Sequence, residues 1–301
     1  MSDAASPAAK KGVSVVIPSL NSAATIGMQL AALAEQDWDG PWEVIVADNG
    51  STDATTEVAR SWSERLPALR VVDAGDRRGA SHARNVGASH ARYPAIIWVD
   101  ADDRVAAGWL RLMGEAAQGS HFFCSWYTGG GTGQEPQILA ATSAPSRGVP
   151  DLFADRAFLA SVGGCEGIGV SREVFDLVGG FEESMVWGSE DAAFCWSVQL
   201  AGYPLERVDG AEVHVLPRSS ARDFFAQQKN WGVGAVDLHR RYADRGAPRS
   251  NTVGAITKWA ALLATSPVAL VLPSYRWRWM GTFARRWGRL VGSIRFRYLY
   301  L

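Results

Sequence analysis

The chain has 301 residues, of which 47% are hydrophobic and 20% are charged, and its formal net charge is −1. This length suits one large α/β domain with additions, and the composition suits a folded protein with a sizeable core. The nearly balanced charge argues against a molecule built as a whole to bind nucleic acid. The cysteines Cys124, Cys165 and Cys195 have neither a zinc-site spacing nor the pattern of a disulfide framework, which favours a reducing compartment.

Residues 1–11 are small and polar and lack the apolar core of a signal peptide, so we expect a disordered lead. From residue 12 onward, strand and helix patterns alternate. This rhythm predicts an α/β fold with a mostly parallel central sheet flanked by helices. The expected strands are Val13–Ile17, Glu43–Ala47, Leu69–Asp73, Ala95–Val99, Ser120–Trp126 and Val213–Val215, and the expected helices are Ala23–Gln36, Thr52–Arg65, Ala80–Ala91, Asp191–Ala201 and Ala221–Tyr242.

Three carboxylates follow the fourth predicted strand, where residues 96–103 read I-I-W-V-D-A-D-D. Carboxylates crowded at a strand end repel one another and are costly to desolvate unless a cation or a hydrogen-bonding ligand meets them. Ligands of open α/β sheets bind at the carboxyl ends of strands, and hard oxygen donors suit Mg²⁺ or Mn²⁺ with phosphates. Adjacent aspartates are also ordinary turn residues, so this motif alone leaves both interpretations open.

Two other strand ends carry polar residues. The first strand ends in P-S-L-N at Pro18–Asn21, and the second in D-N-G-S-T-D, where Ser51, Thr52 and Asp53 are placed to cap the next helix. Neither G-x-G-x-x-G nor a Walker lysine loop follows the first strand, which argues against a nicotinamide dehydrogenase and a P-loop ATPase. The glycine-rich run Gly129–Gly133 predicts a surface loop, with a mobile lid near the site as the alternative.

Six short motifs occur in a fixed order along the chain. They are P-S-L-N at Pro18, D-N-G-S-T-D at Asp48, G-A-S-H-A-R-N-V-G at Gly79, D-A-D-D at Asp100, G-I-G-V-S-R-E-V-F-D-L-V-G-G-F-E-E at Gly167 and W-G-S-E-D at Trp187. This ensemble, spanning about residues 12–242, resembles the family 2 glycosyltransferases, which have the glycosyltransferase A fold. The resemblance implies an inverting, metal-dependent transfer of a sugar from a nucleotide-sugar donor to a hydroxyl acceptor.

The resemblance also implies residues that bind the nucleotide. The backbone at Pro18 and Asn21 would line the base and ribose pocket, and Asp48 would accept a hydrogen bond from the base, most plausibly uracil. Arg84 would lie near the base and the pyrophosphate, and Asp100 would hold the ribose or a metal-bound water. The alternatives are a helix cap for Asp48 and a solvated helix charge for Arg84.

For the cofactor, the resemblance implies Mn²⁺ or Mg²⁺. Asp102 would ligate the cation, which bridges both phosphates and neutralises charge as the glycosidic bond breaks. His214 matches a position where related enzymes carry a metal-ligating histidine. Imidazole suits Mn²⁺ better than Mg²⁺, and packing is the alternative for this residue. Asp103 is expected to cap the next helix, with tuning of the site as the alternative.

An acidic pair provides the candidate catalytic residues. By the resemblance, Asp191 would be the general base that deprotonates the acceptor hydroxyl, and Glu190 would orient sugar hydroxyls. The alternative is an acidic pair favoured by a helix N-terminus. Trp187 could stack on an acceptor sugar or belong to the core.

The C-terminal region, residues 246–301, is predicted to be helical and distinct from a catalytic domain at residues 12–245. Seven arginines and no acidic residue lie in Pro273–Leu301. Apolar residues recur there at helical spacing on the face opposite Arg278, Arg285 and Arg289. They are Met280, Phe283, Trp287, Leu290, Val291, Ile294 and Tyr298. This pattern is typical of a basic amphipathic helix in a membrane interface. The alternative is packing on the catalytic domain or on a second subunit. We therefore expect a cytoplasmic protein attached peripherally to the inner face of the membrane. Its acceptor would be lipid-linked, a glycan or a secondary metabolite.

Two other functions stay open at this point. A non-catalytic nucleotide- or glycan-binding module would have lost the E-D pair or the D-x-D, and both are intact. A sugar-phosphate nucleotidyltransferase ordinarily shows a glycine-rich loop with a basic residue after the first strand, which P-S-L-N-S lacks. The apolar face of the tail argues against nucleic acid as a partner.

Overall fold

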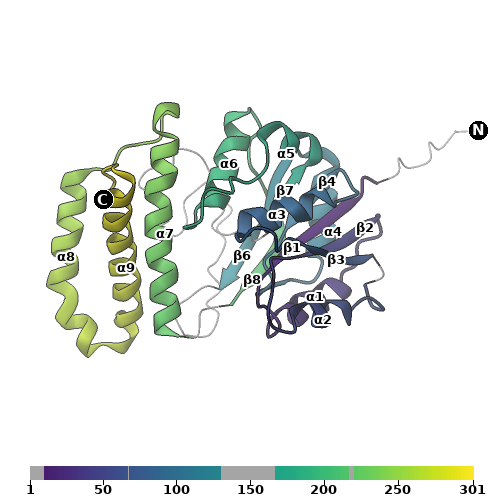
Figure 1. Ribbon diagram of the computed structural model, residues 1–301, viewed down its shortest axis with the longest axis horizontal. Coiled ribbons are helices and arrows are strands. Elements are labelled where there is room, and N and C mark those ends of the chain that lie inside the picture. Colours follow the sequence, from purple (N-terminus) through teal and green to yellow (C-terminus); the bar gives the residue numbers. More distant parts are fainter. Residues whose placement is uncertain (1–9, 67, 130–166, 217–219) are drawn as a thin grey trace, which may run out of the picture. The chain divides into compact units, whose positions relative to one another are not determined.

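A central sheet dominates the computed structural model, which describes residues 10–66, 68–129, 167–216 and 220–301 (Figure 1). In this described part, eight strands pair in the order β3-β2-β1-β4-β7-β6-β8-β5. Neighbours are parallel from β3 to β4, and β7 is antiparallel to both β4 and β6. The strands are β1 Val13–Ser19, β2 Trp42–Asp48, β3 Leu69–Asp73, β4 Ala95–Trp98, β5 Asp103–Val105, β6 Phe122–Gly129, β7 Ile168–Ser171 and β8 Glu206–Val215.

The chain divides into two compact units. The first, called here the sheet unit, comprises Met1–Tyr127, Cys165–Gly180 and Leu200–His214, and the second, the helical unit, comprises Thr128–Gly164, Phe181–Gln199 and Val215–Leu301. The boundary predicted at residue 245 lies inside the helical unit. Most of the predicted glycine-rich loop lies outside the described residues.

Helices cover both faces of the parallel strands. Val15 and Ile17 of β1 belong to a large buried cluster with residues of α1 and α4, while Val16 points the other way, toward α3. A Cβ added at Gly87 of α3 would lie 2.3 Å from Val16, so glycine permits this close approach. Two buried faces explain the nearly continuous apolar runs of these strands. The helices of the sheet unit are α1 Ile26–Ala34, α2 Thr55–Arg60, α3 Ala80–Ser89, α4 Trp109–Gly119 and α5 Arg172–Val178.

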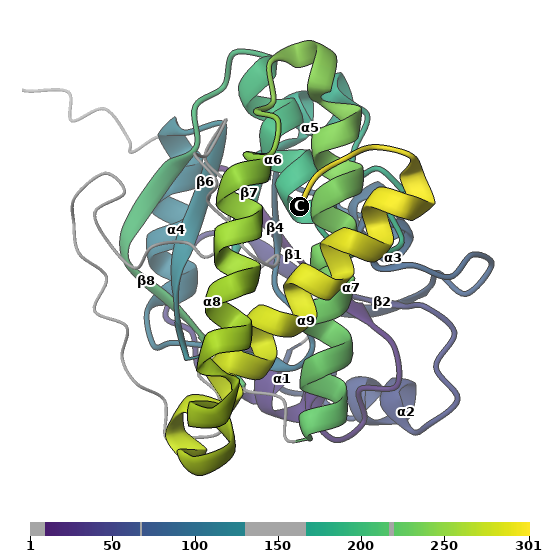
Figure 2. The same ribbon diagram turned by 90° about the vertical axis from the view of Figure 1, so that its left-hand side faces the viewer.

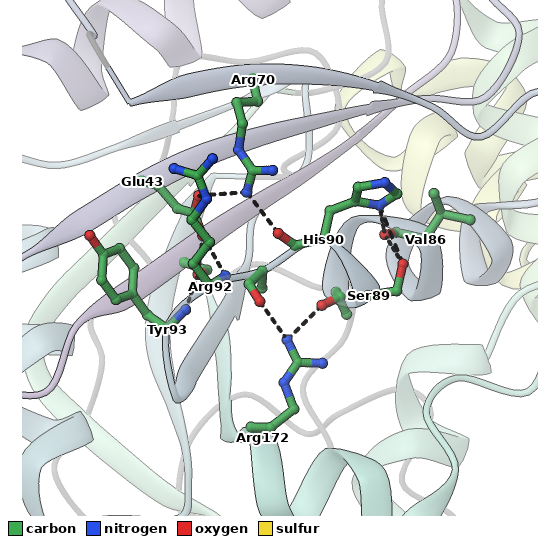
Figure 3. A network of polar contacts seen from close by, with 11 residues as sticks. Glu43, Arg70, Val86, Ser89, His90, Arg92, Tyr93 and Arg172 are labelled. Carbon is green, nitrogen blue, oxygen red and sulfur yellow. Dashed lines mark hydrogen bonds and ion pairs between the residues drawn. The ribbon is translucent and has the colours of Figure 1, made fainter.

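A buried carboxylate stabilises the amino-terminal side of the sheet (Figure 3). Glu43 is 1% exposed and accepts hydrogen bonds from Ser14 Oγ at 2.8 Å, from the Arg92 backbone N–H at 2.7 Å and from Arg70 at 2.6 Å. Burial alone would raise the pKa of Glu43, but these donors outweigh it and hold the pKa below its ordinary value of 4.5. Arg70 also donates to the His90 carbonyl, which joins β3 to the end of α3.

The helical unit contains α6 Glu190–Leu200, α7 Ala221–Arg241, α8 Thr252–Val271 and α9 Pro273–Phe296, and a short 3₁₀ turn, Ala243–Arg245. Helix α9 lies between α7 and α8 (Figures 1 and 2). Glycines allow α7 and α9 to touch along their backbones. A Cβ at Gly232 would lie 2.1 Å from the Arg285 carbonyl oxygen, and one at Gly288 would lie 2.0 Å from that of Lys229. These glycines therefore set the crossing of the two helices.

The burial pattern of α9 differs from the predicted amphipathic pattern. Arg289, which was expected on the polar face, is buried, with its guanidinium 5.1 Å from the centre of the Tyr300 ring. Ile294, which was expected on the apolar face, is 72% exposed. Because small residues allow the α7–α9 contact, the buried stripe of α9 follows its glycines rather than its large apolar residues.

Candidate active site

The predicted donor-binding residues lie where the parallel strands end. Strand β1 has β2 on one side and β4 on the other, so the loops after β1 and β4 diverge at a topological switch point. Open α/β sheets bind ligands in the crevice at such a point. The loops at residues 20–25, 49–54 and 99–102 all begin at this edge of the sheet.

Asn21 connects the first two loops. Its Oδ1 accepts a hydrogen bond from the Thr52 backbone N–H at 2.8 Å, and its own N–H donates to Ser51 Oγ at 2.9 Å. Its φ of 50° lies in the left-handed region, which asparagine tolerates better than most residues. The side chain is thus engaged in loop structure, in keeping with a role for the backbone of this segment toward a ligand.

Asp53, rather than its neighbours, contacts the start of α2. Its Oδ1 accepts from the Thr55 backbone N–H at 3.1 Å, and its Oδ2 accepts from that of Ala23 at 3.1 Å. The prediction that Ser51 and Thr52 cap this helix is wrong, because both bind Asn21 instead.

Asp48 lies at the end of β2 and is 9% exposed. Its two carboxylate oxygens accept from the Ser51 backbone N–H at 3.3 Å, so it does not cap α2 directly. A carboxylate has about four acceptor positions, and one long shared bond leaves capacity for a further donor such as a nucleobase N–H.

Asn49 is a structural residue of the site that the sequence did not reveal. It is 3% exposed, its Oδ1 accepts from the Gly79 backbone N–H at 2.8 Å, and its Nδ2 donates to the Arg77 carbonyl at 2.7 Å. It therefore joins the loop after β2 to the loop that leads into α3. Its position directly after Asp48 was the available signal, since turn asparagines commonly bind neighbouring backbone.

Arg84 and Asp100 form the central ion pair of this edge. Arg84 is 4% exposed on α3, and its Nη2 lies 3.1 Å from Asp100 Oδ1. The indole N–H of Trp98 donates to the Arg84 carbonyl at 3.3 Å, which fixes the helix against β4. Arg84 is therefore not the solvated helix charge that was its alternative. A guanidinium held beside the strand end can also donate to phosphate or ribose oxygens.

The turn after β4 presents the D-x-D. Asp100 and Asp102 are half-buried, while Asp103 is buried and opens β5. The Asp103 backbone N–H donates to the Asp100 carbonyl at 3.3 Å and closes the turn. The expectation that Asp103 caps a helix is wrong, because a strand follows it and α4 begins only at Trp109.

His214 lies on β8, the neighbour of β5, and its side chain is exposed. The Ala106 backbone N–H, just past β5, donates to the Glu212 carbonyl at 2.9 Å. Among the described residues, no group of three or more His, Cys, Asp or Glu side chains is arranged to hold a metal ion. Mg²⁺ ordinarily takes one or two protein carboxylates and completes its shell with phosphates and water. The Asp100–Asp102 turn fits that mode, whereas His214 as a ligand stays a prediction.

The acidic pair begins α6 in the helical unit. Glu190 and Asp191 occupy its first turn and are half-buried, and Asp191 Oδ1 accepts from the Ala192 N–H at 2.7 Å. The two preceding residues have positive φ, 95° at Gly188 and 67° at Ser189. A non-glycine residue in this conformation is strained, and such strain concentrates at functional sites.

Close contacts within the helical unit fix the position of this turn. A Cβ on Gly234 of α7 would lie 2.4 Å from the Gly188 carbonyl oxygen, so the turn rests on the backbone of α7. The hydroxyl of Tyr242 donates to the Ala193 carbonyl at 2.8 Å and lies 2.6 Å from Ser197 Oγ. Burial raises the pKa of Tyr242, which keeps this hydroxyl protonated and able to donate.

Trp187 is half-buried, and the Arg295 guanidinium of α9 lies 4.6 Å from its ring centre. One ring face is therefore occupied by a cation–π contact, which is an attractive interaction for tryptophan. Its stacking on an acceptor sugar stays a prediction. Asp100 and Asp102 belong to the sheet unit, and Glu190 and Asp191 to the helical unit.

Comparison with known proteins relates part of this chain to a family. Residues 14–158 match the model described as glycosyl transferase family 2. The chain is similar to the glycosyltransferase AglE of Haloferax volcanii, with 34% identity over 99 residues, which cover 33% of each protein. The chain thus spans about a third of the length of this curated relative. Residues 14–158 belong to the family 2 glycosyltransferases, as the motifs predicted.

Solved structures agree on the fold. The mannosyltransferase PcManGT of Pyrobaculum calidifontis, in complex with GDP-Man and Mn²⁺, has a TM-score of 0.59 at 20% identity and is matched over 94% of this chain and 88% of its own. TarS 1–349 of S. aureus, in complex with UDP-GlcNAc, has a TM-score of 0.53 at 18% identity, with coverage of 96% and 93%. The predicted glycosyltransferase A fold, with C-terminal helices added, is confirmed.

Proposed function

We propose that the protein is a metal-dependent, inverting glycosyltransferase that moves a sugar from a nucleotide-sugar donor to a hydroxyl acceptor. The observation that carries this proposal is the ion pair between the buried Arg84 and the half-buried Asp100 at the switch point, next to the half-buried Asp102. The positive Arg84 and the negative Asp100, held together at the end of β4, suit a ligand that carries both phosphates and a metal counter-ion. Family membership and the complexes of the two structural neighbours with nucleotide sugars support the same class.

In this proposal the sheet unit binds the donor. Asp48 accepts a base N–H, the backbone of Pro18–Asn21 lines the base and ribose, and Arg84 donates to the pyrophosphate. UDP is the first donor nucleotide to test, and GDP is the second because the neighbours carry either UDP-GlcNAc or GDP-Man. Glu190 would orient donor or acceptor hydroxyls.

Asp102, with Asp100 beside it and His214 as a further candidate, would hold Mn²⁺ or Mg²⁺. When bound, the cation would neutralise the charge that develops on the leaving diphosphate. The carboxylates of Asp100 and Asp102 lie on a turn that a backbone hydrogen bond closes. The turn would therefore need little rearrangement when the metal ion and the nucleotide bind.

Asp191 is the proposed general base. Its carboxylate takes the proton of the acceptor hydroxyl as that oxygen bonds to the sugar anomeric carbon, and the bond from this carbon to the phosphate oxygen breaks with its electron pair leaving on the diphosphate. Attack from the face opposite the leaving group inverts the anomeric centre. Glu190 orients hydroxyls, and Trp187 contacts the acceptor.

We also propose that the chain acts in the cytoplasm beside the inner face of the membrane, with a lipid-linked or membrane-exported acceptor. One helix of the described structure, within Val253–Val271, has the length and composition of a membrane segment, which is weak support by itself.

Calorimetric titration with UDP, GDP and dTDP, with and without Mn²⁺, tests the donor site. The variants are Asp102→Ala and a control, Asp176→Ala, whose carboxylate is 63% exposed on α5. We expect Mn²⁺-dependent binding of one nucleotide that Asp102→Ala weakens by about a hundredfold and the control leaves unchanged. A folded wild-type protein without nucleotide binding would overturn the proposal. Nucleotide binding by a protein that never transfers or hydrolyses the sugar of the matching nucleotide sugar would instead favour a non-catalytic binding module.

A further inference from the structure

Helix α8 carries an apolar surface that its neighbour does not cover. Ala255, Leu262 and Ala269, spaced by seven residues, form its buried stripe. The opposite arc exposes six large apolar side chains by 42–77% of their surface, and these are called here the α8 apolar face. They are Val253, Ile256, Leu263, Val268, Leu270 and Val271.

The composition of α8 separates it from an ordinary surface helix. Lys258 is the single charged residue of Thr252–Val271, whereas a helix on a soluble protein normally turns charged residues outward. Only 17% of Val253–Val271 is buried, so this is not the core helix of a soluble domain either. We propose that the α8 apolar face docks on an anionic lipid bilayer; this assigns the contact surface for the peripheral location proposed above.

The hydroxyls of Thr257, Thr265 and Ser266 are already satisfied within α8. Pro267 has no N–H for the Leu263 carbonyl, and Ser266 Oγ donates to that carbonyl at 2.8 Å instead. The hydroxyls of Thr257 and Thr265 donate to the Gly254 and Ala261 carbonyls at 3.0 and 2.8 Å. Hydroxyls that bond to their own backbone can enter an apolar medium without losing a partner.

The positive charge of the C-terminal region favours an anionic bilayer, rather than a second copy of the chain, as the partner of the α8 apolar face. Residues 246–301 contain eight arginines, one lysine and no acidic residue. Two such regions would repel each other across a dimer, whereas anionic headgroups complement them. The start of α9 adds exposed Arg276 and Arg278 beside the half-buried Tyr275 and Trp277. Aromatic and basic residues together are typical of the membrane–water interface.

The pairing of α8 with α9 indicates that α8 lies along the bilayer surface. The Trp279 indole N–H donates to the Leu262 carbonyl at 2.9 Å, so the first part of α9 packs against α8 (Figure 2). A spanning α8 would draw the arginines of α9 into hydrocarbon, which is strongly unfavourable. An in-plane α8 leaves them at headgroup level, and the glycine contact of α9 with α7 stays intact.

Vesicle flotation of the full chain tests this proposal. The vesicles are phosphatidylcholine alone and phosphatidylcholine with phosphatidylglycerol. The double variant Leu263→Asp/Leu270→Asp changes side chains that are 68% and 77% exposed, and the control Leu177→Asp changes one that is 62% exposed on α5. Circular dichroism and nucleotide titration verify that each variant is folded.

We expect the wild type and the control to float with anionic vesicles, and the double variant to bind at least about tenfold more weakly. Equal flotation of the double variant, or a wild type that stays in the aqueous fraction, would overturn the proposal. So would a wild-type dimer, seen by light scattering, that only the double variant loses. Nucleotide titration of the same samples reports on the donor site separately, so failure of one proposal does not mimic failure of the other.

Discussion

Gly234 offers a direct test of how α7 positions the turn that leads into the proposed catalytic pair, Glu190 and Asp191. In Gly234→Ala the new Cβ would lie 2.4 Å from the Gly188 carbonyl oxygen and 3.0 Å from that of Trp187. Ordinary contacts of a Cβ begin near about 3.4 Å, so the turn must move by about 1 Å. Both opposing atoms are backbone atoms and cannot rotate away. The displaced segment leads directly into Glu190–Asp191.

A misplacement of about 1 Å at a reacting group reduces turnover by about a hundredfold. We therefore expect kcat of Gly234→Ala to fall by that amount, measured as release of nucleotide diphosphate from the sugar donor that titration identifies. The affinity for the nucleotide alone should stay at the wild-type value, because Asp48, Arg84 and Asp102 belong to the sheet unit.

Gly119→Ala is the matched control, since a Cβ at this last residue of α4 meets nothing within 4 Å. Urea unfolding of both variants separates loss of turnover from loss of structure. A folded Gly234→Ala protein with kcat within about twofold of the wild type would refute the positioning of the turn by α7.

Three further predictions concern single side chains. Asp191→Asn should lower kcat by about a thousandfold with unchanged nucleotide affinity, as steady-state kinetics and titration would measure, and a smaller effect than about tenfold would remove Asp191 as the base. Glu43→Gln should lower the free energy of unfolding by about 1–3 kcal/mol at pH 7. Because the folded pKa of Glu43 lies below its ordinary value, this contribution is present above about pH 4.5 and is lost as the pH falls through the folded pKa, so urea midpoints of the wild type and the variant should converge in acid. Tyr242→Phe should cost about 1–2 kcal/mol, because the Ala193 carbonyl and Ser197 Oγ both lose their hydrogen bond with this buried hydroxyl, and unchanged thermal unfolding would contradict this.

The sequence predicted the first half of the fold well because its signals there are local. The strand patterns near Val13, Glu43, Leu69 and Ala95 each end in a polar loop, and the structure has β1 to β4 at these places. β7 escaped prediction because its four residues, Ile168–Ser171, hold no period that distinguishes a short strand from a loop. Helix α4 was missed because its N-cap residue, Gly108, has no side chain that could form the cap hydrogen bond sought in the sequence.

At the candidate site, residue types were readable but partners were not. The motif order pointed to Arg84 and Asp100, yet their pairing depends on α3 packing against β4, which is a tertiary contact. Asp103 was misjudged because a buried aspartate at a strand start and a helix cap share the same local sequence. In α9, the hydrophobic periodicity predicted that the large apolar residues are buried. The face that packs on α7 instead contains Gly288, because two helix backbones can approach this closely only where the side chains between them are small.

The glycine contact between α7 and α9 has an evolutionary consequence. Gly232 and Gly288 lie so close to backbone carbonyls that a Cβ does not fit at either position. Substitution of either glycine by another amino acid is therefore excluded unless the two helices move apart. The α8 apolar face has no such restriction, because its side chains are largely exposed. Descendants of this chain can therefore change the residues of the α8 apolar face, and with them the surface that this face contacts. The crossing of α9 with α7, the helix on which the turn before Glu190 rests, keeps one geometry meanwhile.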